Sequence, residues 1–185
     1  TEPPLNPKQS RERTTELMFE SFGVPAFYLG GTATLSMYSN GLTTGCCVES
    51  GDGNTFVVPM YEGYAHTNDI KQLDIGGRDL SEYLVKLLQE TQSLSVPSAE
   101  ASGSFAIAND IKEKCCYVAA DFEQETKSYS HDQSRYKHEL PDGTEISLGD
   151  ACFQCPEPLF QPELLQAAGI STPPPSGAIG LHKLL

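Results

Sequence analysis

A glycine-rich turn between two β-prone runs constrains the fold of this chain more than any other feature. Residues 43–48 and 55–58 are rich in Thr, Val, Cys and Phe, and Glu-Ser-Gly-Asp-Gly-Asn lies between them. Two β-prone runs joined by turn-forming residues are typical of an antiparallel hairpin. We therefore predict a β-hairpin whose turn is centred on Gly51–Gly53.

The spacing of apolar residues predicts helices around this hairpin. The strongest pattern is Arg78–Gln89, where Leu and Tyr recur every three or four residues and charged residues lie on the other faces. Asn6 before Pro7 is typical of an N-cap followed by proline at the first helical position. We also expect a short buried strand at 26–29 and further helices at 7–22, 32–38, 106–119 and 158–168.

Polar segments separate these elements. Residues 91–104 are rich in Ser and are expected to form a loop, and residues 121–137 are expected to form an exposed, mobile insertion. Pro141-Asp142-Gly143 is a turn sequence between two short β-prone runs, 136–140 and 144–148, and predicts a second hairpin. Helices and hairpins in one chain indicate a mixed α/β protein.

Charge and hydropathy exclude several classes of protein. The 185 residues carry 25 Asp and Glu against 12 Lys and Arg, a formal net charge of −13. Nucleic-acid-binding proteins present basic patches, so we expect no nucleic-acid partner. No apolar run approaches the roughly 20 residues of a membrane span. We expect no signal peptide, because the start of the chain has neither a basic segment nor an apolar core. The first residue is Thr and not Met, so we expect a fragment or a processed chain.

The cysteines do not predict a disulfide framework. Four of the six form the adjacent pairs Cys46-Cys47 and Cys115-Cys116, and neighbouring cysteines strain a disulfide bridge. We interpret these four as small buried hydrophobic residues of a reduced protein. Cys152 and Cys155 form a single CxxC without a second ligand pair, so no metal site is expected. Nothing in the sequence supports a Cys–His nucleophile, because no cationic or helix-terminal setting can be assigned to a thiol.

Three short motifs are compatible with ligand binding, although each has a plainer structural reading. Backbone N–H groups of Gly51–Gly53 could bind phosphate, and Asp52 could orient hydrated Mg²⁺, but most Gly-Asp-Gly turns are only turns. Arg78-Asp79 at a helix start is either a charge pair or a ligand contact. Lys112-Glu113-Lys114 is usual for a solvated helix face.

Many short motifs agree, in order, with those of one family. The motifs are Leu5-Asn6-Pro7, Met18-Phe19-Glu20, Val24-Pro25-Ala26, Ser50-Gly51-Asp52-Gly53, Tyr61-Glu62-Gly63-Tyr64-Ala65, Gly77-Arg78-Asp79-Leu80, Asp110-Ile111-Lys112-Glu113-Lys114, Asp121-Phe122-Glu123-Gln124-Glu125, Glu139-Leu140-Pro141-Asp142-Gly143 and Cys155-Pro156-Glu157. Through them the chain resembles the actin family from Thr1 to about Gly169, and more weakly over 170–185. Its type is similar to a divergent, germ-cell actin-like protein with a role in spermatogenesis.

This resemblance implies a partial α/β fold of the actin-like ATPase (ribonuclease H-like) type. The chain would be the middle part of a longer protein. Residues 1–40 would end subdomain 1, and residues 41–72 would begin subdomain 3 with the phosphate-loop hairpin. Residues 73–165 would form most of subdomain 4, and residues 166–185 would return toward subdomain 3.

The resemblance also implies roles for individual residues. Glu49 and Asp52 would hold Mg²⁺ weakly, through water. Two departures affect catalysis: Thr32 stands where the family has a water-positioning Gln, and Phe56 stands where it has an assisting His. The nucleotide would contact Gly51, Asp52, Gly53, Arg78, Asp79, Lys112 and Glu113.

Two functions follow as expectations, and a third reading stays open. The first is a cytoskeletal or scaffolding protein with a degenerate nucleotide site and little or no ATP hydrolysis; the second is a polymerising, ATP-hydrolysing actin. A truncated product without function is the third. We expect ATP or ADP with Mg²⁺ in the full-length protein but none on this segment alone. The expected partners are cytoskeletal or actin-binding proteins in the cytoplasm.

Overall fold

The computed structural model of the protein describes residues 1–91, 102–129, 137–139, 143, 145–170 and 179–185. The chain divides into two compact units. Unit 1 consists of Thr1–Ser50 and Thr55–Gln72, and unit 2 consists of Gly51–Asn54 and Leu73–Leu185. The turn of the first hairpin therefore belongs to unit 2, whereas its paired strands belong to unit 1.

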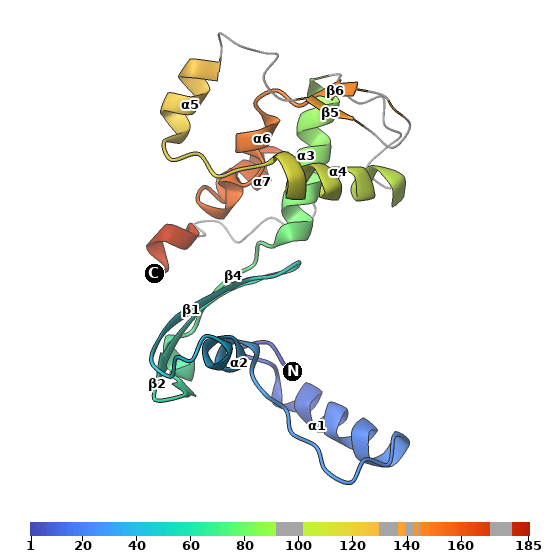
Figure 1. Cartoon of the computed structure of the whole chain (residues 1–185), viewed down its shortest axis with the longest axis vertical. Coiled ribbons are helices and arrows are strands. Elements are labelled where there is room, and N and C mark those ends of the chain that lie inside the picture. The colour runs from blue at the N-terminus through green and yellow to red at the C-terminus, as the bar shows by residue number, and fades with distance from the viewer. Residues whose placement is uncertain (92–101, 130–136, 140–142, 144, 171–178) are drawn as a thin grey trace. The chain divides into compact units, whose positions relative to one another are not determined.

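The predicted first hairpin is confirmed. Strand β1 (Gly45–Ser50) pairs antiparallel with β2 (Thr55–Tyr61), as Figure 1 shows. The register places Ser50 opposite Thr55. Strands β3 (Tyr64–Ala65) and β4 (Lys71–Leu73) also pair with β2, which gives a four-stranded sheet. A 3-10 turn, η2 (Thr67–Asp69), lies between them in sequence.

The connection from β2 to β3 has two residues of left-handed backbone. Glu62 has φ 49° and Gly63 has φ 85°. Positive φ at both central residues matches a type I′ turn, whose twist suits a two-residue hairpin. The N–H of Gly63 donates to the carbonyl of Thr43 at 2.7 Å, so this turn is also held to the segment before β1.

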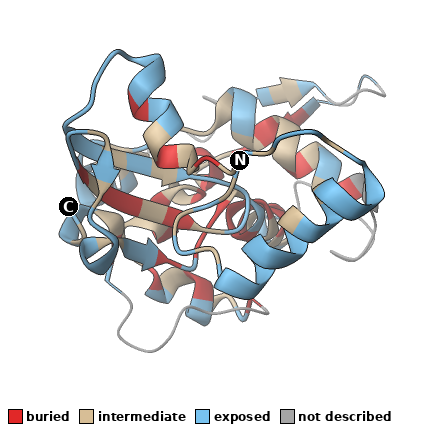
Figure 2. Ribbon diagram, turned by 90° about the horizontal axis from the view of Figure 1, so that it is seen from below, coloured by how far each residue is buried: buried red, intermediate tan, exposed pale blue. Residues whose placement is uncertain are grey.

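Helix α2 (Thr32–Ser39) covers the sheet of unit 1. Its buried residues Ala33 and Met37 form a small core with Val58 and Met60 of β2. Strand β2 alternates toward this core and contributes most of the buried side chains, whereas no residue of β1 is buried; Figure 2 colours the chain by this burial. Thr55 and Val57 point to the opposite face of the strand and are buried as well, so both faces of β2 are covered.

The N-terminal helix forms as predicted, but its start and its surroundings differ. Helix α1 (Lys8–Glu16) runs into a π-helical turn, η1 (Leu17–Ser21), and neither element has a buried residue. The predicted cap at Asn6 is wrong by one residue, because Pro7 is the N-cap and the Asn6 amide donates to Glu2 instead.

The predicted strand at 26–29 is also wrong. These residues have no strand pairing, and the neighbouring backbone contact is a bridge from Glu2 to Gly31. A short apolar run becomes a strand only where a partner edge is available, and here Glu2 donates to Gly30 while Thr32 donates back to Glu2.

Unit 2 is mostly helical. Its longest helices are α3 (Gly77–Glu90) and α4 (Ser102–Cys115), followed by α5 (Phe122–Tyr129). The second predicted hairpin is confirmed as β5 (Lys137–Glu139) paired antiparallel with β6 (Glu145–Ser147), although residues 140–142 and 144 of its turn lie outside the described part. The remaining elements are α6 (Ala151–Gln154), η3 (Glu157–Leu159), α7 (Glu163–Ala167) and η4 (Leu181–Lys183).

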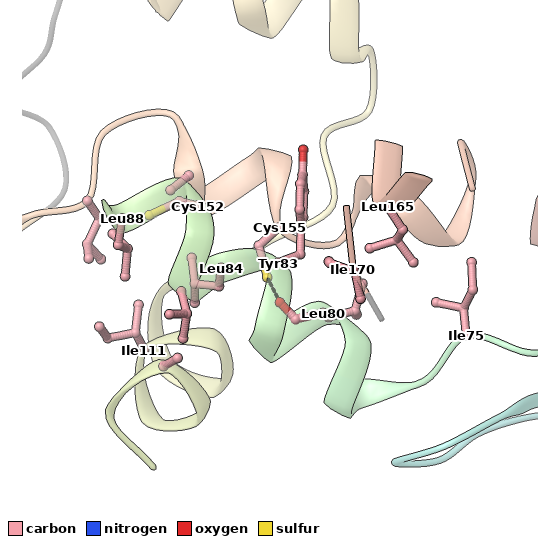
Figure 3. Packing of buried hydrophobic residues seen from close by; sticks show 14 of the residues in the cluster. Ile75, Leu80, Tyr83, Leu84, Leu88, Ile111, Cys152, Cys155, Leu165 and Ile170 are labelled. Atoms are coloured by element: carbon pink, nitrogen blue, oxygen red, sulfur yellow. Dashed lines mark hydrogen bonds between the residues drawn. The ribbon is translucent and has the colours of Figure 1, made fainter. Parts of the chain in front are cut away.

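Helix α3 carries the core of unit 2. Its apolar face buries Leu84 and Leu88 completely or nearly so, as the leucine spacing predicts. Ile146 of β6 belongs to the same core. Figure 3 shows others of its members, among them Ile111 of α4, Cys152 of α6, Cys155 directly after α6 and Leu165 of α7. The Cys155 thiol donates to the Leu80 carbonyl at 3.5 Å, the bond drawn in Figure 3.

Two sequence expectations for unit 2 need correction. Helix α4 was expected at 106–119, but it begins at Ser102 and ends at Cys115, where the N–H of Tyr117 leaves the helix to donate to the Cys152 carbonyl. The segment 121–137 was expected to be an exposed, mobile insertion; its described part contains the helix α5, none of whose residues is buried, and residues 130–136 lie outside the described part. The rings of Phe122 and Tyr129 pack edge-on against buried Phe153, which anchors that helix.

The interpretation of the paired cysteines as buried hydrophobic residues is wrong for Cys46, which is exposed, and only partly right for Cys47, Cys115 and Cys116, which are half-buried. Cys152 and Cys155 of the CxxC are the fully buried ones. Burial raises the pKa of Cys152 to about 12, so this thiol stays neutral.

We predict that Leu84→Ala destabilises unit 2 by about 2–5 kcal/mol, because it removes a fully buried side chain from the centre of the core. Denaturant unfolding of the chain followed by circular dichroism measures the effect. Glu90→Ala on the exposed end of the same helix is the matched control and should change the unfolding free energy by less than about 0.5 kcal/mol. Equal effects of the two substitutions would contradict this view of the core.

Candidate functional site

The glycine turn Gly51–Asn54 is bonded to the start of helix α3. The N–H of Gly51 donates to the Asn54 carbonyl at 3.0 Å and closes the turn. The N–H groups of Gly77 and Arg78 donate to the carbonyls of Gly51 and Asp52, each at 2.9 Å. The first N–H groups of a helix have no acceptor within the helix. Here the carbonyls of the turn are the acceptors for two of them.

This docking requires glycine at position 76. A Cβ atom on Gly76 would overlap the carbonyl oxygen of Asp52 and the backbone of Gly53. The N–H of Gly76 donates to the Asp79 carboxylate at 2.8 Å, and Asp79 is buried. Asp79, which the resemblance assigns to nucleotide contact, therefore caps helix α3 in the structure.

Arg78 and Asp52 face each other across the docked turn. A guanidinium nitrogen of Arg78 lies 3.1 Å from a carboxylate oxygen of Asp52, and both side chains are about two-thirds exposed, at 66% and 65%. An ion pair this exposed contributes little to stability. Its structural effect is to hold two charged groups, one of each sign, at the rim of the turn.

The backbone of the turn leaves three donors available. Among the described residues, the N–H groups of Asp52, Gly53 and Asn54 donate to no other group of the protein. The Asn54 side chain donates to Asp74 at 2.8 Å and fixes the end of the turn. Consecutive free N–H groups in a turn can cradle an anion such as phosphate.

Lys112 reaches the same helix start from α4. Its ammonium group donates to the carbonyl of Gly77 at 2.8 Å and to the Ser81 hydroxyl at 2.9 Å. The reading of Lys112 as part of a solvated face is therefore wrong, because this side chain is half-buried and joins α4 to α3. Glu113 is exposed and accepts a hydrogen bond from Asn109 at 2.9 Å.

Ser81 and Asn109 also belong to this group of contacts, although they were not among the predicted site residues. The Ser81 hydroxyl lies within hydrogen-bonding distance of the Gly77 carbonyl and the Asn109 amide oxygen, at 2.9 and 3.2 Å. Ser81 is fully buried, although serine usually lies at the surface. Its position one helical turn after Gly77 is the sequence signal that could have identified it. The structure thus joins the turn, Arg78, Asp79 and Lys112 into one network, with Glu113 attached through Asn109.

A second polar group lies in unit 1 and involves the two departures from the family pattern. The Thr32 hydroxyl donates to one carboxylate oxygen of Glu49 at 2.7 Å, and the Ser36 hydroxyl donates to the other at 3.2 Å. Phe56 lies opposite Glu49 in the β1–β2 register and packs against the core of Val58 and Met60. These side chains form a positioned carboxylate beside an apolar ring.

We predict that Gly76→Ala separates the glycine turn from helix α3 and destabilises unit 2 by about 1–3 kcal/mol, because the added methyl group overlaps backbone atoms. Thermal unfolding measures the loss. Gly53→Ala is the matched control: it lies in the same turn with open space around its Cβ position, and it should leave stability unchanged or slightly raised. A Gly76→Ala protein as stable as the control would refute the close contact.

Two kinds of feature are absent from the part of the chain that the structure describes. Among the described residues, no helix combines the length and apolar character needed to cross a bilayer. No three His, Cys, Asp or Glu side chains within the described ranges converge as metal ligands.

The family model described as Actin matches residues 1–185, and the mixed helix and sheet content fits its α/β fold. The chain therefore belongs to the actin family.

Proposed function

We propose that this chain is part of an actin-like structural or scaffolding protein that retains contacts to a nucleotide but hydrolyses ATP very slowly or not at all. The observation that carries the proposal is the occupied Thr32–Glu49 pair beside Phe56, next in sequence to an intact glycine turn. The glycine turn bears on nucleotide binding, whereas the residues at positions 32 and 56 bear on ATP hydrolysis.

Retained binding is supported by the glycine turn and its neighbours. The free N–H groups of residues 52–54 can donate to phosphate oxygens, and the exposed Arg78 guanidinium adds positive charge. Lys112 holds the start of α3 in place, so its role toward nucleotide is to keep this network rigid. Unit 2 provides one glycine turn for the phosphates, so we expect this part of the protein to bind nucleotide weakly.

Asp52 suits a Mg²⁺ ion held through water. Mg²⁺ keeps several waters and takes only one or two carboxylates together with substrate phosphates. The Asp52 side chain is exposed, and the Arg78 ion pair occupies one of its carboxylate oxygens. Glu49 is less suited, because each of its carboxylate oxygens already accepts a hydroxyl hydrogen bond. When bound, the ion would neutralise phosphate charge, and Asp52 would orient its water shell.

Loss of hydrolysis follows from the groups that stand at 32 and 56. Phosphoryl transfer to water depends on positioning the water and stabilising charge. Phe56 has no polar atom, and its ring contributes to an apolar core. Thr32 has a single hydroxyl proton, which it donates to Glu49. Phe56 therefore cannot polarise a water molecule, and Thr32 has no proton left to donate to one and is shorter than the Gln it replaces.

A polymerising ATPase is the second candidate. It is favoured by the docked glycine turn and the Arg78–Asp52 pair, which are the parts an active nucleotide site also needs. Sedimentation of the full-length protein with ATP separates the two candidates, since a polymerising actin pellets and the proposed scaffold does not.

The wider assignments are proposals as well. We propose that unit 1 corresponds to the end of subdomain 1 and the start of subdomain 3, and that most of unit 2 corresponds to subdomain 4. The family membership supports cytoskeletal or actin-binding partners and a cytoplasmic, cytoskeletal location. A role in spermatogenesis is proposed from the divergent character of the chain, and expression by cell type tests it.

We expect single-turnover phosphate release from the full-length protein to be about 10²-fold slower than from the double variant Thr32→Gln with Phe56→His, which restores both water-directing groups. Ser36→Ala is the matched control, because it alters the other partner of Glu49 and leaves both positions unchanged; its rate should equal that of the unaltered protein.

An unaltered protein that releases phosphate as fast as the double variant would contradict the proposed loss of hydrolysis. Nucleotide extracted from the purified protein is measured in parallel. Co-purified ADP or ATP, depleted in Asp52→Ala, is the result expected from retained binding, and its absence would remove that part of the proposal.

A further inference from the structure

A cluster of reactive side chains in unit 2 takes no part in the proposed nucleotide site. The thiol sulfur of Cys115 lies 3.6 Å from Nδ1 of His138. Nε2 of the same ring lies 3.3 Å from Oδ2 of Asp110. These residues come from α4 and β5, and Cys115 and His138 are separated by 23 positions. The sequence alone did not indicate this Cys–His contact, because the two residues are brought together by the fold.

The order of contacts assigns a role to each nitrogen of the ring. Because Asp110 accepts from Nε2, that nitrogen carries the proton of the neutral imidazole, and Nδ1 is left to accept the thiol proton of Cys115. A hydrogen bond from Lys114 lowers the pKa of Asp110, so this carboxylate is ionised at neutral pH. A carboxylate in this place also stabilises the imidazolium that forms when Nδ1 takes a proton.

The three residues differ in exposure, since the Asp110 side chain is 45% exposed and lies at the surface. The His138 side chain is 11% exposed, whereas Cys115 is half-buried at the last residue of α4. Cys152 and Cys155 are fully buried, and Cys46 is exposed with no imidazole bonded to it among the described residues. The chain therefore contains an exposed thiol without a base and a less exposed thiol with one.

We propose that Cys115 is a modification site, where His138 acts as the base that enables the thiol to react with hydrogen peroxide and form a sulfenic acid. This inference is independent of nucleotide binding, because none of its three residues contacts the glycine turn. It gives the protein a site at which oxidants can alter the end of helix α4.

The reaction balances with peroxide as the oxidant. The thiol proton of Cys115 moves to Nδ1 of His138, and the sulfur attacks one oxygen of the peroxide. The S–O bond forms as the O–O bond breaks, so the sulfur is oxidised by two electrons and the peroxide is reduced. The leaving hydroxide takes the proton from Nδ1 and departs as water, which returns His138 to its neutral form.

Burial sharpens the test, because it raises the pKa of Cys115, with Cys116 and Asp110 adding to the effect and Lys114 opposing it. Without a base, Cys115 would then react more slowly than exposed Cys46, since the thiolate is the nucleophile. The proposal predicts the reverse order of the two cysteines in the same sample.

The experiment treats the full-length protein with hydrogen peroxide and dimedone, which traps sulfenic acid, and quantifies each cysteine by tandem mass spectrometry with fragmentation between the adjacent Cys115 and Cys116. We expect Cys115 to be labelled faster than Cys46. His138→Gln keeps a polar side chain but removes the base, and should slow labelling of Cys115 relative to Cys46 by about tenfold or more. Glu139→Gln, at the next position of β5, is the matched control and should change nothing.

Labelling of Cys155 checks folding in every sample, because that thiol is fully buried in the native chain. If His138→Gln exposes Cys155, Asp110→Asn decides instead, and a smaller but measurable loss of Cys115 labelling is expected from it. Labelling of Cys115 no faster than that of Cys46 would overturn the proposal. A fast Cys115 whose rate is unchanged in folded His138→Gln or Asp110→Asn protein would overturn it equally.

Discussion

Two backbone hydrogen bonds, from Gly77 and Arg78 to the glycine turn, are the interaction on which the organisation of unit 2 around its candidate site depends. These bonds give acceptors to two N–H groups that a helix start leaves unpaired. They also hold the turn in place while, among the described residues, the N–H groups of Asp52, Gly53 and Asn54 donate to no other group of the protein. The bare α-position of Gly76 permits this approach, and the buried Asp79 carboxylate closes the cap beneath it. Stability of the helix and availability of the turn therefore have the same cause.

Several other polar side chains are engaged in contacts within the protein itself. Lys112 and Ser81 are occupied in joining α4 to α3, so they support the site without presenting free groups. In unit 1, Thr32 is occupied by Glu49, and Phe56 by the core. The free backbone donors of the turn in unit 2, and the engaged Thr32 and apolar Phe56 in unit 1, are the separate observations behind the proposed actin-like scaffold with little or no ATP hydrolysis.

The sequence predicted those features that local chemistry determines. The glycine turn between β-prone runs specified the first hairpin, and the leucine spacing specified α3, because both signals act within a few residues. The strand at 26–29 failed because a strand also needs a partner edge, which no local pattern reveals. Gly76-Gly77 indicated only a break, and its close contact with the turn depends on residues more than twenty positions away. The Cys115–His138 pair was invisible for the same reason.

Amide hydrogen exchange of the full-length protein, with and without Mg-ATP, tests the central claim most directly. The account predicts that Gly77 and Arg78 exchange slowly in both samples, because the turn accepts their bonds. The amides of Asp52, Gly53 and Asn54 should exchange fast without nucleotide and slowly with it. Fast exchange at Gly77 and Arg78 before nucleotide is added, or no protection of residues 52–54 after it, would contradict the account.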